Sequence, residues 1–387
     1  MEMKEIAALN ERLREHILSL AKAESWKCND ELIAESIASF EGEPYLGGIR
    51  NVYIVGHGTS FATASNAESL IAHIAKVYAR ALHAYQLREY PEEFILDPDK
   101  TLVIGVTCGG NTVSVKLALK AAREMGAHTM LISNDGNASC AEFADLRVKT
   151  DCNVEQAADV QAYSVSHLFL LEAAYEVAVL LAKKNGAADE KQAAVWKEKF
   201  EDVRAKMACL PELFDEMEKI ATWYKGTGTE NMVVLGTGPN MGTMVEGALK
   251  ICEMAWKFGA GEELEDFAHG RFREMDGKIP LFIITPDGKT REKVLDLLAG
   301  CNISGTPTVL FTGSTTPAVE KLATHIVRMP EVEDEYLTPF LYVFPLWFFG
   351  YHVRKMENGL VGEKRFGLFA KDIDFKAHFN EAGEWIG

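Results

Sequence analysis

Residues 101–123, which read TLVIGVTCGGNTVSVKLALKAAR, decide the fold of this chain. The stretch opens with an apolar, β-branched run, continues through a glycine-rich segment at 107–112, and then shows helical spacing. Val113, Leu117 and Ala121 recur every fourth residue and so share one helix face. We therefore predict a strand, a turn and a helix in succession, which is the connection that builds α/β proteins.

The turn at 107–112 carries the groups that can hold a phosphate. Gly109 and Gly110 let the backbone approach an anion closely, and the first N–H groups of the following helix point at it. Thr107 and Thr112 add hydroxyl donors. An ordinary strand-to-helix turn shares these features, so the turn by itself leaves both interpretations open.

Size and charge narrow the class of protein. The chain has 387 residues, of which 48% are hydrophobic, and this suits a globular protein of about two or three domains. Its net charge of −17 disfavours nucleic acid or an anionic membrane as a partner. A small anionic ligand is still compatible with this charge, because hydrogen-bond donors beside the ligand outweigh the field of distant acidic side chains.

Cysteine usage and apolar runs indicate a cytoplasmic protein. The seven cysteines form no C-x-x-C pair, so we expect neither a disulfide framework nor a metal site, and no cofactor. The first twenty residues are too charged for a signal peptide. The longest apolar run, 340–353, is too short to span a bilayer, and we expect a helix there that packs in a core or a subunit interface.

Strands and helices alternate along most of the chain, and the pattern occurs twice. A strand followed by Gly-x-Gly and a helix begins its turn at residue 56 and again at residue 236, which is 180 residues later. Strands are expected at 52–55, 80–85, 101–106, 128–133, 232–235, 280–284, 307–311 and 326–329, and long helices at 4–20, 30–40, 157–184 and 190–224. We predict an α/β fold of two tandem doubly wound parallel-sheet domains with added terminal helices. The boundaries are an N-terminal helix at 1–30, a first domain at 31–200 and a second at 201–387.

These features resemble the sugar isomerase (SIS) domain family over about residues 30–375. The resemblance rests on the two tandem domains, the G-x-G-T-S turn after the first strand and the turn after the third strand. Family members hold the sugar phosphate at the latter turn with an S-x-S-G-x-T sequence, whose middle serine is Gly109 here. The resemblance implies that the phosphate is held by Thr59, Ser60, Thr107, Gly109 and Thr112.

The resemblance also implies a catalytic pair in the second domain. Family enzymes carry a glutamate and a histidine 16 residues apart, and Glu253 and His269 have this separation. Glu253 would be the base, because burial in a pocket raises a carboxyl pKa toward neutrality, and His269 would be the acid. The alternative is a surface glutamate and a packed or capping histidine. Trp256 matches a glutamate-x-x-tryptophan run of the fructosamine 6-phosphate deglycases, whereas Arg271 replaces the usual proline after His-Gly.

Four further positions are candidates whose role stays open. Asp266 lies in the acidic run 262–266, which is either a solvated loop or a site that attracts a cationic amine. Gln161 and Ser164 lie either in a substrate-lining loop or at the start of a helix. Lys371 resembles the ring-opening lysine of glucosamine 6-phosphate synthase, although the nearby Lys-Arg-Phe sequence resembles the ending of the deglycases at least as well.

Three functions follow from the resemblance. The first is a hydrolase that deglycates a fructosamine 6-phosphate to an amine or amino acid and glucose 6-phosphate. The second is an aminosugar phosphate isomerase or deaminase of the glucosamine 6-phosphate type, and the third is a non-catalytic sugar-phosphate sensor. We expect an enzyme that works at least as a homodimer, with the site at the interface. No N-terminal glutaminase segment is apparent, which disfavours a full amide-transferring synthase.

Overall fold

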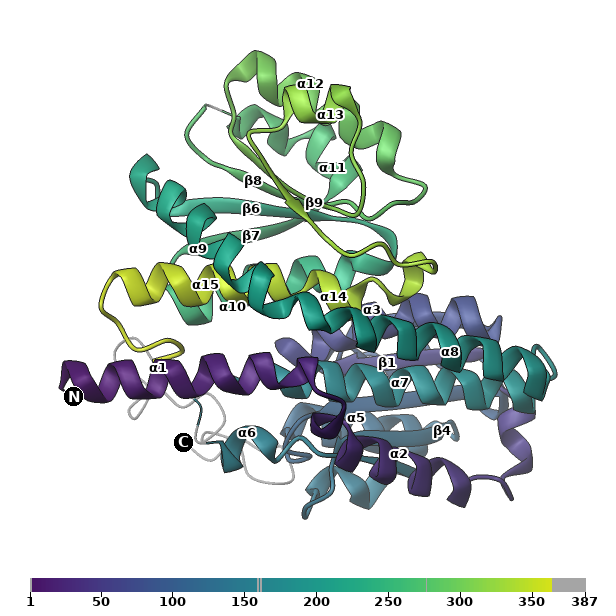
Figure 1. The fold of residues 1–387 in the computed structure, drawn as a ribbon. Helices are drawn as coiled ribbons and strands as arrows, with labels where there is room; N and C mark the ends of the chain where they lie inside the picture. The colour runs from purple at the N-terminus through teal and green to yellow at the C-terminus, as the bar shows by residue number, and fades with distance from the viewer. Residues whose placement is uncertain (1, 159, 161, 276, 364–387) are drawn as a thin grey trace. The chain divides into compact units, whose positions relative to one another are not determined.

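The computed structural model describes residues 2–158, 160, 162–275 and 277–363. Contacts divide the chain into two compact units, and each contains one five-stranded parallel sheet (Figure 1). One unit covers residues 22–197, and the other covers 198–363 together with the N-terminal helix α1 (Met3–Leu18). The predicted α/β fold of two doubly wound parallel sheets is therefore confirmed.

The sheet of the first unit has the strand order β2-β1-β3-β4-β5, and all its pairs are parallel. Because strands in a parallel sheet are covered on both faces, they read as continuous apolar runs, as the stretch after Thr101 does. The strands are β1 (Asn51–Gly56), β2 (Tyr78–His83), β3 (Thr101–Thr107), β4 (His128–Asn134) and β5 (Leu146–Thr150).

Helices cover both faces of this sheet. Val103 and Leu131 pack against Val115 and Leu119 of the helix that follows β3, and these side chains form the core of one face. The helices in contact on that face are α4 (Ala84–Glu89) and α5 (Val113–Glu124). The other face is covered by α2 (Lys27–Ser39), α3 (Thr59–Ala75) and α7 (Val165–Lys184), and the short α6 (Val154–Ala157) precedes α7.

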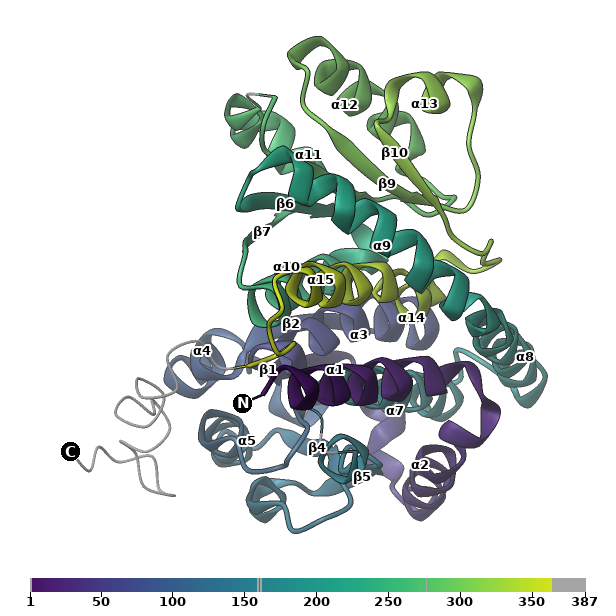
Figure 2. The same cartoon turned by 60° about the vertical axis from the view of Figure 1, so that its left-hand side comes forward.

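The second unit repeats this topology. Its order, β7-β6-β8-β9-β10, matches the first sheet strand for strand. The strands are β6 (Asn231–Gly236), β7 (Phe258–Glu263), β8 (Leu281–Ile284), β9 (Thr308–Thr312) and β10 (His325–Arg328). Figure 2 shows α9 (Leu210–Thr227), α10 (Met241–Ala255) and α15 (Phe344–Met356) on one face, and α11 (Leu264–His269), α12 (Arg291–Ser304) and α13 (Pro317–Leu322) on the other.

Several predicted helices have different limits in the structure. The helix predicted at 157–184 begins only at Val165, because the backbone N–H of Ser164 turns back to donate to the buried Glu155 carboxylate. The helix predicted at 190–224 is two helices, α8 (Glu190–Lys206) and α9, and Pro211 lies in the first turn of α9. A short α14 (Pro339–Tyr342) precedes α15, which has Pro345 in its first turn.

The N-terminal helix belongs by contact to the second unit. The Asn10 amide donates to the carbonyl of Gly359 at 3.0 Å and accepts from the N–H of Val361 at 2.9 Å. The guanidinium of Arg14 lies 5.1 Å from the ring centroid of Phe214 on α9. These contacts tie α1 to the segment that follows α15.

Helix α7 is the one helix in the described part of the chain that is long and apolar enough to cross a membrane. However, 89% of its apolar window is buried inside the protein. Such burial is what the central helix of a domain core shows, because a spanning helix presents much of its surface to lipid.

Two buried histidines of the second unit predict acid sensitivity. Burial lowers the pKa of His352, whose Nε2 donates to the carbonyl of Phe214 at 2.9 Å, to about 4, and it does the same for His16. In the unfolded chain an imidazole titrates near 6.5, so below that pH the unfolded state binds protons that the folded state does not. Stability contributed by these groups is complete above pH 6.5 and falls toward pH 4, by up to about 1.4 kcal/mol per pH unit for each histidine.

Urea unfolding between pH 7.5 and pH 5 measures this slope. The matched variant is His352→Gln, which keeps a donor for the Phe214 carbonyl and removes the titrating group. The free energy of unfolding of this variant should depend less steeply on pH than that of the unchanged chain. Equal slopes would exclude His352 as a source of the acid sensitivity.

Candidate functional site

Two turns at the carboxyl edge of the first sheet form the candidate phosphate site. Because β1 and β3 are parallel neighbours, the turns that follow them, 56–60 and 107–112, leave the same edge side by side. The glycines of the first turn are structurally required. A Cβ at Gly56 would lie 2.6 Å from the carbonyl oxygen of Ser60, and Gly58 has φ +56°.

Each turn leads into the N-terminus of a long helix. The N-cap residue of α3 is Gly58, which has no side chain to cap the helix, and that of α5 is Thr112, whose side chain makes no cap bond. The Thr112 hydroxyl is instead hydrogen-bonded to the Thr107 hydroxyl at 2.9 Å. Two helices, α3 with 17 residues and α5 with 12 residues, therefore begin at this edge of the sheet without a side-chain cap. Such ends attract an anion through their N–H groups and dipoles.

The remaining phosphate candidates surround this position. Thr59 and Ser60 are half-buried at the start of α3, and Thr107 is buried at the end of β3. Gly109 is exposed, and no heavy atom of the described residues lies within 4 Å of the position its Cβ would take. The turn thus has open space at the point where family members carry a serine.

Ser164 lies at the start of α7 in the structure. It is the N-cap residue of α7, its side chain is fully buried, and its backbone N–H donates to the Glu155 carboxylate. It therefore does not present its hydroxyl on the surface of this unit. Gln161 and Lys371 lie outside the described residues.

Glu253 lies in the last turn of α10, and its side chain is more exposed than the burial in a pocket that we predict from the sequence. Its side chain is 46% exposed, so the predicted desolvation in a pocket is wrong for the single chain. Its Oε2 lies 2.6 Å from Nζ of Lys250, whose side chain is only 2% exposed, and that ammonium lies 3.6 Å from Oε1 of the fully buried Glu246. A buried lysine thus orients the exposed carboxylate.

Lys250 is not among the residues predicted from the sequence. A usable signal was present, because Glu246 and Glu253 flank it at i−4 and i+3 on a helix that is otherwise mostly apolar. Side chains at these spacings lie on the same face. A lysine held on a buried face by two acids indicates a group that is fixed in position.

Lys250→Met is expected to lower the free energy of unfolding by about 3–5 kcal/mol, because it removes the cation that faces a fully buried carboxylate at 3.6 Å. Glu253→Gln alters the exposed partner and should leave stability nearly unchanged. Urea unfolding of the two variants side by side measures the difference. Equal losses in both would show that the buried Glu246 does not depend on Lys250.

The acidic run at 262–266 is not a loop. Glu262 and Glu263 end β7, and the residues from Leu264 onward form α11. The Glu263 carboxylate caps this helix by accepting the backbone N–H groups of Glu265 at 2.7 Å and Asp266 at 2.9 Å. The side chain of Asp266 is exposed.

His269 is the last residue of α11, and its side chain is 74% exposed. Its Nε2 lies 3.0 Å from Oε1 of Glu265. Lys293, at 2.6 Å, and His269 both bond to Glu265 and lower the pKa of that carboxyl group. The imidazole is therefore accessible to solvent and has an ionised acid beside it.

The fold does not bring Glu253 and His269 together within one chain. Helix α10 ends at Ala255, β7 then runs along the edge of the sheet, and α11 starts at the far end of that strand. A six-residue strand is about 20 Å long. Helices α10 and α11 also lie on opposite faces of this sheet (Figures 1 and 2).

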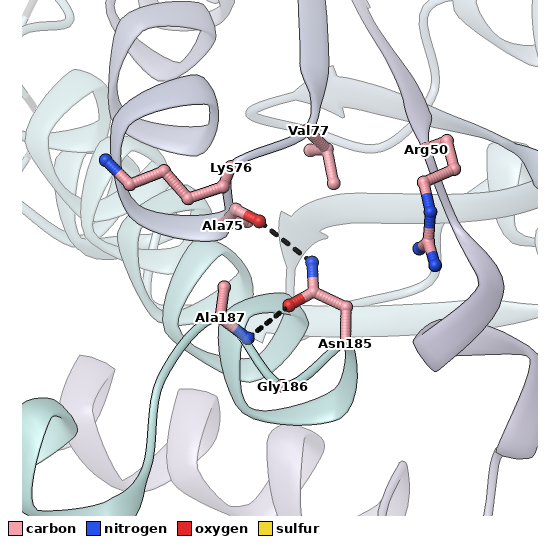
Figure 3. Close-up of a pocket in the computed structure, with 7 residues that line it drawn as sticks. All are labelled: Arg50, Ala75, Lys76, Val77, Asn185, Gly186 and Ala187. Carbon is pink, nitrogen blue, oxygen red and sulfur yellow. Dashed lines mark hydrogen bonds between the residues drawn. The ribbon is translucent and has the colours of Figure 1, made fainter.

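A cavity of about 270 Å³ lies in the first unit but away from these turns. Its lining includes Arg50 and Val77, which precede β1 and β2, so it opens at the amino edge of the sheet, opposite the turn at 107–112. Figure 3 shows the Asn185 amide hydrogen-bonded to both Ala75 and Ala187, and the Lys76 side chain directed away from Arg50. Among the described residues, no group of three or more His, Cys, Asp or Glu side chains is placed to hold a metal ion.

Comparison with known proteins identifies the family. The model of the SIS domain matches the chain twice, at residues 46–179 and 228–353. The chain belongs to the SIS domain family. The two matches contain the two sheets, and the first match includes both turns of the candidate phosphate site. The resemblance seen in the sequence is confirmed.

The SIS relatives include aminosugar enzymes. The chain is 29% identical over 330 residues to glutamine–fructose-6-phosphate aminotransferase [isomerizing] of Thermococcus kodakarensis, covering 84% of this chain and 51% of that protein. The chain spans about half the length of the curated relatives it matches. The C-terminal domain of glucosamine-fructose-6-phosphate aminotransferase from Francisella tularensis has a similar structure, with a TM-score of 0.78, 21% identity, and coverage of 91% of this chain and 98% of that domain.

A third neighbour is glucosamine-6-phosphate deaminase from Thermotoga maritima. Its TM-score is 0.62 at 19% identity, over 89% of this chain and 98% of that one. At these identities, the two structural neighbours establish the fold that the chain shares with them. They leave its substrate to be argued from its own residues.

Proposed function

We propose that this protein is an aminosugar 6-phosphate isomerase or deaminase that acts on glucosamine 6-phosphate. The observation that carries the proposal is the pair of helix N-termini without side-chain caps at adjoining strand ends, with threonine hydroxyls beside them. This arrangement suits a phosphate monoester. The amino group of the substrate is inferred from the names of the relatives, two of which are aminotransferases of fructose 6-phosphate and one a glucosamine-6-phosphate deaminase.

The proposed roles of the residues follow from their chemistry. Thr59, Ser60, Thr107 and Thr112 donate to the phosphate, together with backbone N–H groups of the turn that contains Gly109. Glu253, oriented by Lys250, takes the C2 proton of the ring-opened aldose and returns it to C1, which gives the C2 imine of the ketose. Water then adds to C2 and ammonia leaves, so glucosamine 6-phosphate and water become fructose 6-phosphate and ammonia.

His269 is proposed as the acid, acting in the site of a second copy of the chain. The separation of Glu253 and His269 by β7 and by the sheet supports a homodimer in which each site takes one residue from each copy. An exposed imidazole that lies beside the Glu265 carboxylate is suitable for donating a proton to a leaving group across such an interface. Lys371 remains the candidate for ring opening.

Mixing two inactive variants tests the shared site. Glu253→Gln and His269→Asn are each expected to be inactive. If the copies exchange at random, half of the dimers are mixed, and each mixed dimer has one intact site, so about a quarter of the original activity returns. No recovery after unfolding and refolding the two variants together would show that both residues serve a site in the same chain.

A fructosamine 6-phosphate deglycase is the second candidate, and one observation favours it. Trp256 follows Glu253 at the end of α10, as in the deglycases. Its indole N–H donates to the carbonyl of Glu363 at 2.9 Å, and the Arg354 guanidinium lies 3.5 Å from its ring centroid. Trp256 is therefore a fixed feature of the surface beside Glu253.

A substrate panel separates the two functions. The chain is incubated with glucosamine 6-phosphate, with fructoselysine 6-phosphate and with the aspartate analogue of the latter. Ammonia and fructose 6-phosphate from the first compound would support the isomerase or deaminase. Free amino acid and glucose 6-phosphate from either fructosamine would establish the deglycase in its place. Binding without turnover of any of the three would indicate a sensor.

A further inference from the structure

The second unit carries its own copy of the phosphate-type turn. β8 occupies the place in its sheet that β3 occupies in the first, and the residues after it, 285–290, read TPDGKT against TCGGNT at 107–112. The first, fourth and sixth positions are identical. The second turn also leads into a long helix, the 14-residue α12, whose N-cap residue Thr290 makes no side-chain cap bond.

A carboxylate from a distant part of the chain lies on this second turn. A Cβ built at Gly288 would lie 2.4 Å from Cδ of Glu335 and 2.5 Å from each of its carboxylate oxygens. The backbone N–H of Lys289 donates to the same carboxylate, and the Lys289 charge faces it. Glu335 is half-buried there, and this burial raises its pKa, while Lys289 acts in the opposite direction. The glycine is required because the carboxylate occupies the space above it.

The first turn differs at the corresponding positions. None of its six residues is acidic, and Gly110, which corresponds to Gly288, faces Cβ of Ala138 at 2.3 Å where Gly288 faces a carboxylate. The space at the preceding residue, Gly109, is open among the described residues. In the second turn the same position is Asp287, whose Oδ1 accepts from the hydroxyl of Ser314 at 2.7 Å and from Arg291 at 3.1 Å. The Asp287 charge is compensated by these neighbours, so Glu335 is the acid that covers the turn itself.

We propose that Glu335 is an internal substitute for a phosphate group, which closes the second turn and restricts phosphosugar binding to the first. A carboxylate offers two negative oxygens to the N–H groups at a helix N-terminus, as a phosphate does. The chain thus satisfies the second turn from within, and Glu335 determines which of two homologous turns is open. The restriction to the first turn rests on the proposed function, whereas the closure of the second does not.

Binding stoichiometry tests this role. Sorbitol 6-phosphate, an open-chain phosphosugar that cannot isomerise, is titrated into the 387-residue chain by calorimetry. The unchanged chain should bind one molecule per chain, and Glu335→Ala should bind two, because it empties the second turn. Glu335→Gln is the matched control, since its amide still fills the space above Gly288, and it should stay at one.

A second variant distinguishes an effect on the second turn from a folding defect. Glu335→Ser should behave as the alanine variant does. If either variant melts early, millimolar phosphate should restore its melting temperature by refilling the turn. Folded alanine and serine variants that gain no site, or an early melting that phosphate does not reverse, would overturn the proposal.

The same titration separates this proposal from the proposed function. The number of sorbitol 6-phosphate molecules bound by the unchanged chain tests the first turn. The additional molecule bound after Glu335 is replaced tests the second turn. An unchanged chain that binds nothing while the alanine variant binds one would reject the first turn and uphold the role of Glu335. Adding Gly109→Asp to Glu335→Ala should remove one of the two molecules and so assign the sites.

Discussion

Glu253→Gln is expected to lower kcat for glucosamine 6-phosphate by roughly a thousandfold, within the range that positioned general bases contribute. Glutamine has the size of glutamate but cannot take the C2 proton. Lys250 keeps the Glu246 carboxylate at 3.6 Å, so the change leaves no buried charge unpaired. KM should change little, because a proton acceptor contributes to the transition state and not to ground-state binding.

The measurement is steady-state kinetics with ammonia as the product assayed, together with binding of sorbitol 6-phosphate. Glu292→Gln is the control, because Glu292 is also an exposed acid of the second unit but lies in the first turn of α12. It should leave kcat unchanged. Full activity of the Glu253 variant would reject its role as base, whereas a loss of binding would make it a substrate-holding residue.

The central strands and the repeat were predictable from sequence because buried parallel strands carry continuous apolar runs. β7 was missed for the opposite reason, since Phe258–Glu263 has two glycines and two acids and no apolar pattern. The structure explains Gly259 and Gly261 by close packing of α10. Their Cβ atoms would lie 2.9 Å from the carbonyl oxygen of Ala248 and 2.5 Å from Sδ of Met244. When the residues of a strand are determined by a helix that packs against it, the strand has little pattern of its own from which it can be predicted.

The candidate site was predictable in part. The turns at 56–60 and 107–112 have local sequence signals, and the structure places them at adjoining strand ends. The environment of Glu253 was not predictable, because its exposure depends on which face of α10 meets the sheet and α15. The role of Lys250 was not predicted, because a lysine in a mostly apolar helix is expected to face solvent, and its burial is known only from the structure.

The two copies of the fold have diverged in complementary ways. The first has an open turn between two helix N-termini, and none of the six residues of 107–112 is acidic. The second has its corresponding turn covered by Glu335 and carries Lys250, Glu253 and His269 on the helices around its sheet. On the proposed function, one copy binds the phosphate and the other supplies the proton-transferring groups.

Gly109 offers the sharpest test of the phosphate turn, because a side chain can be added there without a steric conflict among the described residues. Gly109→Asp should raise KM for glucosamine 6-phosphate by about a hundredfold or more, since like charges about 4 Å apart near a protein surface repel by roughly 4 kcal/mol. Gly109→Ser should lower KM by roughly tenfold or more, because a hydroxyl that reaches the phosphate adds a hydrogen bond to a charged group. Both changes act on binding and should leave kcat nearly as it was.

Gly109→Asn separates charge from size in this series, because asparagine and aspartate have the same shape. If the turn holds the phosphate, the asparagine variant should keep KM within about tenfold of the original, since a neutral amide can donate to the anion. Melting temperatures should agree across the three variants, which follows from the open space at this position. Equal effects of aspartate and asparagine would make the perturbation steric, and an unchanged KM in the aspartate variant would place the phosphate elsewhere.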